Sequence, residues 1–388
     1  MSESQLRVCE ISHFFCYAAY RQKAAAMARL TGERELLLVP ANWTEDFHRS
    51  GMELDASDAY ILRTRRAFLN WRIWGPKRFQ LFVLSPRIVA DLRSFRPDVI
   101  AVDAEPFALL ALEVALIRRA FFPRTCLVVH SSQSLYKRYP FPFNRTEAFV
   151  LREATALFAR TDAIRQVLRR KGCRQAVYVV PHGVDVDRFS PAPHGERNSS
   201  AQHDPIRIGY VGALARHKGV HTLIEALSRL EVPFSLSIAG DGPERRRLEA
   251  QASEGPNAAA IHFHGSVPNA RLPEMLRKLD VLVVPSVTMA NWNEQFGRVV
   301  IEAMACGVPT IGSTCGALPE VIGDGGLIFA EGEADSLRAA LERLAMDRAE
   351  LAALARRARQ RVLDRFSWQA VARQILPIYR ELTTARPA

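Results

Sequence analysis

The residues with the clearest chemical potential in this sequence are two glutamates, Glu294 and Glu302, with seven residues between them. On one continuous helix, which rises about 1.5 Å per residue, they would be roughly 12 Å apart. That separation exceeds the roughly 5–9.5 Å between the paired carboxylates of a glycoside hydrolase, so a hydrolytic couple is not expected. An apolar run, Val281–Pro285, precedes the pair. We therefore expect Glu294 on the loop after a strand and Glu302 inside the following helix.

Between the two carboxylates lie the backbone amides of Gln295, Phe296 and Gly297, near the expected helix N-terminus. Free amides and the positive end of the helix dipole favour anions and polar oxygen atoms there. Two carboxylates beside a patch of donors suit a ligand rich in hydroxyl groups. The alternative is one helix-capping glutamate and one exposed helical glutamate. Because Glu302 falls within the apolar stretch Val299–Met304, we prefer the binding role.

The stretch from Asn293 to Pro309 resembles the E-x7-E signature of retaining, nucleotide-sugar-dependent glycosyltransferases with the GT-B fold, namely glycosyltransferase family 4 (glycosyl transferases group 1). The resemblance implies an α/β protein with two Rossmann-like, doubly wound domains facing a central cleft. It also implies a hexosyltransferase-like enzyme that moves a sugar from a nucleoside diphosphate to a hydroxyl acceptor. In that setting Glu294 would act in catalysis and bind the sugar hydroxyls of the donor, and Glu302 would bind the ribose.

A second segment, residues 209–219, resembles the glycine-bearing loop of the same family. Gly212 would let the backbone approach the diphosphate of the donor. Arg216 and Lys218 would stabilise the negative charge that the leaving nucleoside diphosphate gains, each charge-assisted hydrogen bond contributing roughly 1.5–3 kcal/mol. One alternative is two surface cations at a helix start. Another is a dinucleotide-binding fingerprint, but neither this loop nor Gly240-Asp-Gly242 completes G-x-G-x-x-G.

The first half of the chain resembles the family less closely. His130 follows the apolar run Cys126–Val129, where the family often has a sugar-contacting histidine, so we expect a catalytic role, with a strand-capping histidine as the alternative. Asp103-Ala-Glu105-Pro106 ends another strand and either binds an acceptor hydroxyl or starts a helix with proline in its first turn. The segment 11–23 lacks the glycines that the family often carries there, and no site residue is assigned to it.

These residues need a scaffold, and the alternation of short apolar runs with helical patterns indicates β-α units around parallel sheets. We expect an N-terminal acceptor-binding domain over residues 1–195, a C-terminal nucleotide-sugar-binding domain over 205–365, and a crossover helix over 366–388 that returns to the first domain. The polar, turn-rich segment Pro191–Pro205 is the expected linker. One of the helices expected in the first half is Asn144–Leu157. Ligands of such sheets bind at the carboxyl ends of the strands.

The net charge of +11 is unevenly distributed. Residues 1–200 hold 30 Lys and Arg against 20 Asp and Glu, whereas residues 201–388 hold 22 against 21. The N-terminal half therefore suits an acidic partner or surface. Its densest basic segment, residues 63–79, interleaves arginines with Trp71, Trp74 and Phe79, as membrane-interface segments do. A solvated basic face is the alternative, and no nucleic acid is expected as a partner because no binding motif for it accompanies the segment.

Composition places the chain among globular proteins, with 48% hydrophobic and 24% charged residues, and its 388 residues favour two domains. The six cysteines include no C-x-x-C pair, which predicts reduced, buried thiols and no zinc site. No apolar run is long enough to span a bilayer, and the N-terminus has no signal-peptide pattern. We expect a cytoplasmic protein, with peripheral attachment to the cytoplasmic face of the membrane as a further option.

Together these patterns predict a retaining glycosyltransferase that needs no metal and no cofactor besides its nucleotide-sugar donor. Asp185-Val-Asp187 has the D-x-D spacing that can hold Mg²⁺, but it falls in an expected turn. The expected acceptor is a saccharide or a lipid-linked molecule, in the synthesis of a cell-surface polysaccharide or glycolipid. The alternatives are a sugar-nucleotide epimerase or glycogen-type synthase of the same fold, and a non-enzymatic module that binds membrane or nucleic acid.

Overall fold

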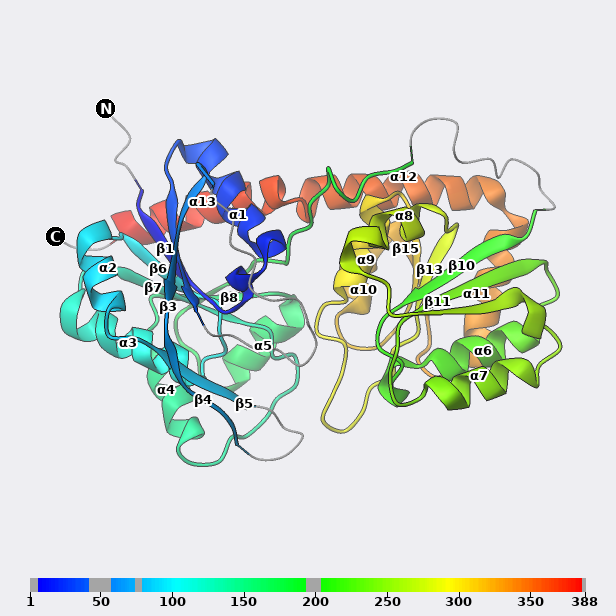
Figure 1. The fold of residues 1–388 in the computed structure, drawn as a ribbon, viewed down its shortest axis with the longest axis horizontal. Coiled ribbons are helices and arrows are strands. Elements are labelled where there is room, and N and C mark those ends of the chain that lie inside the picture. The colour runs from blue at the N-terminus through cyan, green and yellow to red at the C-terminus, as the bar shows by residue number, and fades with distance from the viewer. Residues whose placement is uncertain (1–5, 42–56, 74–78, 193–203, 386–388) are drawn as a thin grey trace. The chain divides into compact units, whose positions relative to one another are not determined.

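The computed structural model describes residues 6–41, 57–73, 79–192 and 204–385, and it divides the chain into two compact units (Figure 1). Unit 1 consists of Met1–Gly183 and Trp368–Ala388, and unit 2 of Val184–Ser367. Residues 184–192, which we expected in the N-terminal domain, thus fall in unit 2. The physical reason is apolar packing, since Val184, Val186 and Phe189 are buried in a core of unit 2.

Unit 1 is built on a seven-stranded, fully parallel sheet in the order β3-β2-β1-β6-β7-β8-β9. Most of these strands are continuous apolar runs because helices cover both faces of the sheet. The strands are β1 (Val8–Ile11), β2 (Glu35–Pro40), β3 (Tyr60–Arg65), β6 (Val99–Val102), β7 (Cys126–Ser131), β8 (Ala156–Ala159) and β9 (Ala176–Val179). A separate antiparallel hairpin joins β4 (Ala67–Ile73) to β5 (Phe79–Leu84).

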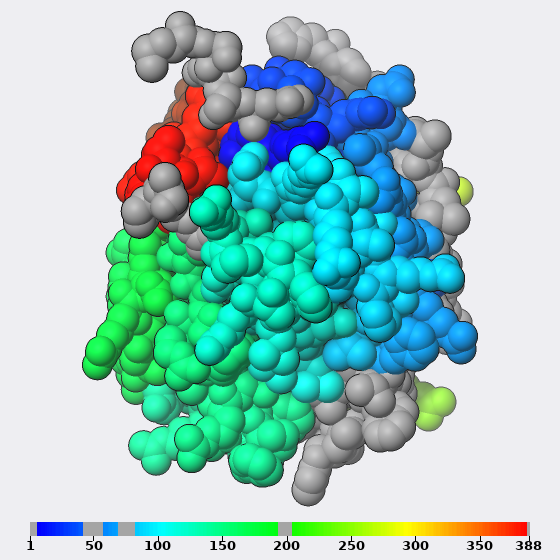
Figure 2. Space-filling model, turned by 90° about the vertical axis from the view of Figure 1, so that its left-hand side faces the viewer, coloured from blue at the N-terminus to red at the C-terminus, as the bar shows by residue number. Residues whose placement is uncertain are grey.

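The helices of unit 1 lie on both faces of its sheet. One face packs against α2 (Ile88–Phe95), α3 (Leu109–Phe121), α4 (Phe143–Glu153) and α5 (Asp162–Arg170). Figure 2 looks onto the side of unit 1 where the cyan to blue-green residues of α2, α3 and α4 form much of the surface. The other face packs against α1 (Ala18–Thr31) and α13 (Trp368–Thr384), so the C-terminal helix belongs to the core of the first unit.

Two sequence expectations for unit 1 need correction or restriction. The helix expected over Asn144–Leu157 ends at Glu153, because Ala156–Ala159 is a fully buried strand between β7 and β9. Within the basic segment 63–79, Arg63 and Arg65 both bind the carboxylate of Asp91, so these two charges serve the fold. Residues 74–78 of that segment, Trp74 among them, lie outside the described residues, as do the side chains of Trp71 and Phe79.

Unit 2 repeats the same architecture with a six-stranded parallel sheet in the order β12-β11-β10-β13-β14-β15. The strands are β10 (Ile206–Val211), β11 (Phe234–Ala239), β12 (Ile261–Gly265), β13 (Val281–Val284), β14 (Thr310–Ser313) and β15 (Gly326–Phe329). Alternate side chains of β13 pack on opposite faces of the sheet. Val281 and Val283 belong to the core on one face, and Leu282 and Val284 belong to the core on the other.

Helices also cover both faces of this second sheet. They are α6 (Val220–Ser228), α7 (Arg245–Ser253), α8 (Leu272–Arg277), α9 (Arg298–Ala305), α10 (Leu318–Ile322), α11 (Ala334–Met346) and α12 (Arg348–Arg365). Each sheet thus has parallel strands with helices on both sides, which is the doubly wound arrangement that the sequence predicts. Within the described ranges, no helix combines the length and apolar character needed to cross a membrane.

Candidate functional site

The predicted site residues of unit 2 lie at the carboxyl edge of its sheet, where the strand order reverses. β10 is hydrogen-bonded to β11 on one side and to β13 on the other. The chain therefore leaves β10 and β13 into neighbouring loops at the point where doubly wound sheets bind ligands. Gly212, Arg216 and Lys218 follow β10, whereas Glu294 follows β13.

Glycines let the loops after β10 and β11 pack directly against each other. A Cβ atom on Gly240 would lie 1.8 Å from the carbonyl oxygen of Gly212, and one on Gly242 would lie 2.4 Å from that of Leu214. The backbone amide of Leu214 donates to the carbonyl of Asp241 at 2.9 Å. Bare backbone therefore lines this corner of the site, as expected for a loop that approaches a diphosphate.

A short 3-10 turn, η2 (Arg216–Lys218), brings the loop after β10 onto the loop after β13. The backbone amide of Val287 donates to the carbonyl of His217 at 2.9 Å. Gly219 ends the turn in the left-handed conformation, with φ +70°, and a Cβ there would lie 1.8 Å from the carbonyl oxygen of Pro285. The position of Lys218 is thus fixed by backbone contacts with the neighbouring loop.

Lys218 and Glu294 form an ion pair at the centre of this edge. The Lys218 Nζ lies 2.7 Å from Glu294 Oε2, and the hydroxyl of Ser286 donates to the same oxygen at 3.0 Å. The ammonium also lies over the ring of Trp292, 4.7 Å from its centroid. The two side chains keep 24% and 12% of their surface exposed, so the pair is accessible to a ligand.

The loop after β14 holds the backbone of Glu294. The amide of Ala317 donates to the Glu294 carbonyl at 2.9 Å, and the Glu294 amide donates to Cys315 Sγ at 3.4 Å. Gly316 passes so close that a Cβ would lie 2.1 Å from the same carbonyl oxygen. The position of the Glu294 carboxylate is therefore determined by its own loop, after β13, and by contacts with the loops after β10 and β14.

The other predicted residues of this site differ in their surroundings. Arg216 and Gln295 are exposed, and within the part of the chain that the structure describes Arg216 forms no ion pair. The side chain of Phe296 is only 4% exposed and packs in the core, so any ligand contact of this residue goes through its backbone. Gly297 is the N-cap of α9 at φ +78°.

Glu302 lies on α9, as expected, but its carboxylate pairs with Arg298 at 3.6 Å, not with Lys218. Burial raises the pKa of Glu302, and the charges of Arg298 and Arg188 oppose that rise. The structure thus brings Lys218 and Glu294 together, and it holds Glu302 in a separate, half-buried contact.

In unit 1, polar groups stand at the carboxyl ends of adjacent strands. Asp103 follows β6, His130 is near the end of β7, and Arg160 follows β8. Arg160 donates to Asp103 at 2.7 Å, so this ion pair spans the end of the strand that carries His130. Burial raises the pKa of Asp103, but Arg160 and other nearby basic groups, Lys23 among them, together hold it well below its usual range.

His130 is almost completely buried, with 1% of its surface exposed. Burial lowers its pKa well below the usual value, and the charge of Arg160 acts in the same direction, so the imidazole is neutral at pH 7. Among the described residues, neither of its ring nitrogens has a hydrogen-bond partner. A buried neutral imidazole with both nitrogens unpaired is suited to a ligand hydroxyl or an ordered water.

Some supporting residues escaped the sequence analysis. Ser286, Cys315 and Gly316 hold Glu294, and Arg160 pairs across His130. Their signal in the sequence is weak, namely a polar or small residue just after an apolar run. The carboxylate of Asp185 accepts from the amides of Asp187 and Arg188 at 3.1 and 3.0 Å, which matches the expected turn. All six cysteines are buried, as predicted, and the described structure has no disulfide between them.

Two family models match the sequence in succession. The model described as Glycosyltransferase Family 4 matches residues 41–188, and the model described as Glycosyl transferases group 1 matches residues 195–361. Among curated proteins, the chain is 30% identical over 295 residues to 2-deoxystreptamine glucosyltransferase of Streptomyces kanamyceticus, covering 71% of this chain and 75% of that protein. It is 32% identical over 248 residues to the putative colanic acid biosynthesis glycosyltransferase WcaL of Escherichia coli K12, covering 59% of each.

Solved structures resemble the whole chain. A sucrose-phosphate synthase from Thermosynechococcus elongatus superposes with a TM-score of 0.74 at 24% identity, covering 98% of this chain and all of that one. Anabaena Alr3699/HepE in complex with UDP superposes with a TM-score of 0.72 at 19% identity, covering 97% of this chain and all of that one. At such identities the likeness shows the fold, which is GT-B.

Proposed function

The chain belongs to the group 1 glycosyltransferases of family 4, and from that premise we propose that it moves a sugar from a nucleoside diphosphate to a hydroxyl acceptor with retention at the anomeric carbon. The ion pair between Lys218 and Glu294 carries this proposal. It places a cation and a carboxylate side by side at the carboxyl edge of a doubly wound sheet, where a phosphate and a sugar hydroxyl need opposite partners.

Unit 2 is the proposed donor site. Gly212 and the glycines beside it leave room for the diphosphate, and Arg216 and Lys218 supply positive charge to it. Glu294 accepts from the sugar hydroxyls, the backbone at Gln295, Phe296 and Gly297 donates to the donor, and Glu302 accepts from the ribose. Anabaena HepE, which has this fold, was crystallised with UDP and with UDP-glucose, and that supports a nucleotide-sugar donor here.

His130 of unit 1 is assigned to a hydroxyl group of the transferred sugar. Its neutral imidazole can donate from one ring nitrogen and accept at the other. The ion pair of Asp103 with Arg160 lies beside it. Burial and, after it, the charge of Arg160 lower the pKa of His130 and so keep the imidazole uncharged.

Retention follows from attack on the face that the leaving group vacates. The bond from the anomeric carbon to the diphosphate oxygen breaks while a bond from the acceptor oxygen forms on the same face. The acceptor's proton passes to the departing phosphate oxygen, so no enzymic nucleophile is required. Lys218 and Arg216 stabilise the charge on that phosphate, and this is the interaction that strengthens most in the transition state.

We propose that the two cations replace a divalent metal in this role and that no cofactor takes part. Asp185 and Asp187, the pair with the spacing of a metal-binding motif, are part of a turn that the Asp185 carboxylate caps. The metal-free reaction is tested below with a chelator.

The acceptor is proposed to be a saccharide, free or lipid-linked, in the synthesis of a surface polysaccharide or glycolipid. The relationship to WcaL, a putative colanic acid biosynthesis enzyme, supports this assignment. The charge of the N-terminal half supports contact with an anionic membrane surface on the cytoplasmic side. In unit 1, Phe121 is exposed, and the guanidinium of Arg93 lies 5.2 Å from the centroid of its ring. This pair combines a positive charge with an aromatic ring at the surface of the N-terminal half.

The proposal is tested by thermal shift with UDP, GDP and ADP and their sugars, followed by product analysis with the nucleotide that binds. A bound donor raises the midpoint of thermal unfolding. Transfer to an acceptor with the anomeric configuration kept supports the proposal, whereas an epimerised donor or chain extension of a glucan supports the alternatives. If no nucleotide stabilises the protein and no nucleotide sugar is consumed, the proposed function is wrong.

A further inference from the structure

A second carboxylate, Glu105, stands at the carboxyl edge of the unit 1 sheet and has no part in the donor site. It follows β6, which pairs with β1 at the point where the strand order of that sheet reverses. The hydroxyl of Ser131 donates to Glu105 Oε2 at 2.8 Å, and the amide of Ser132 donates to Oε1 at 2.6 Å. Two donors from the end of β7 therefore fix the direction in which this carboxylate points.

Charged groups near Glu105 have partners of their own. Asp103 is paired with Arg160 at 2.7 Å, and Lys171 is paired with Glu147 at 2.6 Å. Within the described ranges, the two serine donors are the partners of Glu105, and no cation forms an ion pair with it. An ionised carboxylate accepts about four hydrogen bonds, so half of its capacity is left for a ligand.

The carboxylate does not serve the helix that follows. The sequence left open that residues 103–106 start a helix, but α3 begins at Leu109, with Ala108 as its N-cap and no side-chain cap. Only the backbone carbonyl of Glu105 takes part in the turn, where it accepts from the amide of Ala108 at 2.8 Å. Burial raises the pKa of Glu105 to about 7. The hydrogen bonds from Ser132 and Ser131 lower the pKa, but they do not offset the effect of burial.

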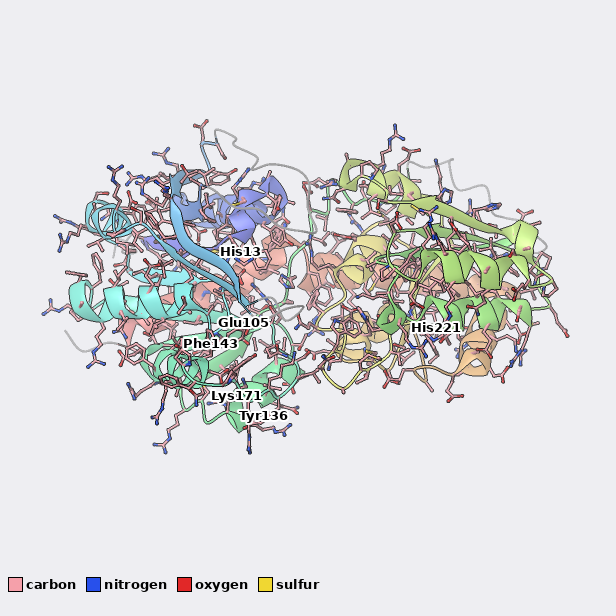
Figure 3. All side chains as sticks on the ribbon, turned by 60° about the horizontal axis from the view of Figure 1, so that its bottom comes forward. His13, Glu105, Tyr136, Phe143, Lys171 and His221 are labelled. Atoms are coloured by element: carbon pink, nitrogen blue, oxygen red, sulfur yellow. The ribbon has the colours of Figure 1, made fainter. Side chains whose placement is uncertain are left out.

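Aromatic residues lie near this carboxylate: Phe107 is two residues further along the chain, and the charge of Glu105 adds to burial in raising the pKa of Tyr139. The rings of Phe107 and Tyr139 lie 4.2 Å apart, and Tyr139 packs with Phe143. The Lys171 ammonium lies 4.5 Å from the ring centroid of Tyr139 and so ties the loop before α4 to the end of α5. Figure 3 shows Glu105, Phe143, Lys171 and Tyr136 following one another along unit 1.

A fixed carboxylate with unused acceptor capacity beside aromatic rings has the chemistry that binds a sugar ring, through its hydroxyl groups and its C–H faces. We propose that Glu105 binds a hydroxyl group of the saccharide acceptor and sets acceptor affinity in this enzyme. This inference rests on the proposed function, and it adds the residue that binds the saccharide acceptor.

The test compares Glu105→Gln with Glu113→Gln in the full chain. Glu113 is a matched control, because burial also raises its pKa to about 7 and its carboxylate also accepts from a backbone amide, that of Leu84 at 2.8 Å. It differs in place, since it lies on α3 and contacts the separate β4-β5 hairpin. The acceptor probes are n-octyl glycosides of glucose, galactose and mannose. Three quantities are measured for each variant: binding of the probe by saturation-transfer NMR, KM for the probe, and hydrolysis of the nucleotide sugar without acceptor.

We expect Glu105→Gln to raise the KM for the probe about tenfold or more, because one hydrogen bond to a charged group is lost. Donor hydrolysis should stay at the wild-type rate, and Glu113→Gln should leave the KM unchanged. Should Glu105→Gln not fold, Glu105→Asp, which keeps the charge, should bind the probe more weakly than wild type while hydrolysing the donor normally.

Several results would overturn the inference. Wild-type KM in Glu105→Gln, equal loss of donor hydrolysis and transfer in that variant, or normal probe binding by Glu105→Asp each exclude a role in acceptor binding. Wild-type protein that hydrolyses the donor but binds none of the three glycosides excludes this acceptor class. If wild-type protein consumes no nucleotide sugar at all, the proposed function itself fails, and the inference fails with it.

Discussion

Lys218 Nζ lies 2.7 Å from Glu294 Oε2, and this contact joins the turn after β10 to the loop after β13 in unit 2. The cation that is proposed to bind the diphosphate is therefore held by the carboxylate that is proposed to bind the sugar. Ser286 and Trp292 complete the surroundings of the pair. Residues in direct contact act as a unit, so the two roles cannot be altered separately.

A double-mutant cycle on this pair should be strongly non-additive. Lys218→Ala and Glu294→Ala are each expected to lower kcat about a hundredfold, because each removes a charge that acts on the transition state and releases the other side chain. The double variant should lose little more than either single variant. Steady-state kinetics with the donor identified by thermal shift measure all four proteins.

Lys278→Ala is the control for this cycle, since Lys278 also forms a 2.7 Å ion pair with a glutamate of unit 2, Glu274, but in an exposed position on the surface. It should keep wild-type kcat. Losses that multiply in the double variant would show that Lys218 and Glu294 act independently.

Replacement of Gly219 by alanine should lower stability and activity together. The residue has φ +70°, and its new Cβ would lie 1.8 Å from the Pro285 carbonyl oxygen, so the turn that carries Lys218 must move. We expect a loss of about 2 kcal/mol or more in the free energy of unfolding, from strain and overlap. Chemical denaturation measures the loss.

Gly332→Ala separates strain from overlap. Gly332 has φ +80°, but nothing lies within 4 Å of its added Cβ. It should lose only about 1 kcal/mol and keep its activity. Equal effects of the two substitutions would mean that the contact with Pro285 does not position the turn.

The sequence predicts the elements that carry the proposed donor-site residues better than the contacts between those residues. Glu294 on a loop and Glu302 on the next helix follow from a strand pattern and a helix pattern in one continuous segment, and the structure confirms both positions. The contact between Lys218 and Glu294 joins residues from different β-α units, and no local pattern encodes which side chains meet across a sheet edge. The contacts of Ser286 and Gly316 with Glu294 also join different loops, so no local pattern encodes them either.

The first unit shows where local patterns mislead. Ala156 and Leu157 extend a helical pattern that begins near Asn144, but they are fully buried and pair with strands on both sides. Tertiary burial therefore decides between strand and helix in a short apolar run. The role expected for His130 comes from the family resemblance at the end of an apolar strand. The ion pair of Asp103 with Arg160 beside it depends on the order of the strands in the sheet, which no local pattern gives.

Removal of divalent metals should leave transfer unchanged. Arg216 and Lys218 are proposed to supply the positive charge that Mg²⁺ gives in metal-dependent glycosyltransferases, so treatment with EDTA should not alter kcat. The measurement is product formation after dialysis against EDTA, compared with the same protein given Mg²⁺ or Mn²⁺. Loss of activity with EDTA and recovery with Mg²⁺ would refute the metal-free mechanism.

Glu113→Gln should stabilise the protein above neutral pH and not below it. Burial raises the pKa of the Glu113 carboxyl from 4.5 to about 7, although its hydrogen bond from the Leu84 amide opposes that rise. A raised carboxyl pKa means that the folded state holds the proton more tightly than the unfolded state, so this contribution to stability is full below pH 4.5 and is lost as the pH rises through 7. A glutamine is neutral throughout and can still accept from Leu84.

Because Glu105 titrates in the same range, the measured quantity is the difference in unfolding free energy between variant and wild type. That difference should shift by about 1–2 kcal/mol in favour of the variant between pH 5 and pH 8, and a pH-independent difference would contradict the raised pKa.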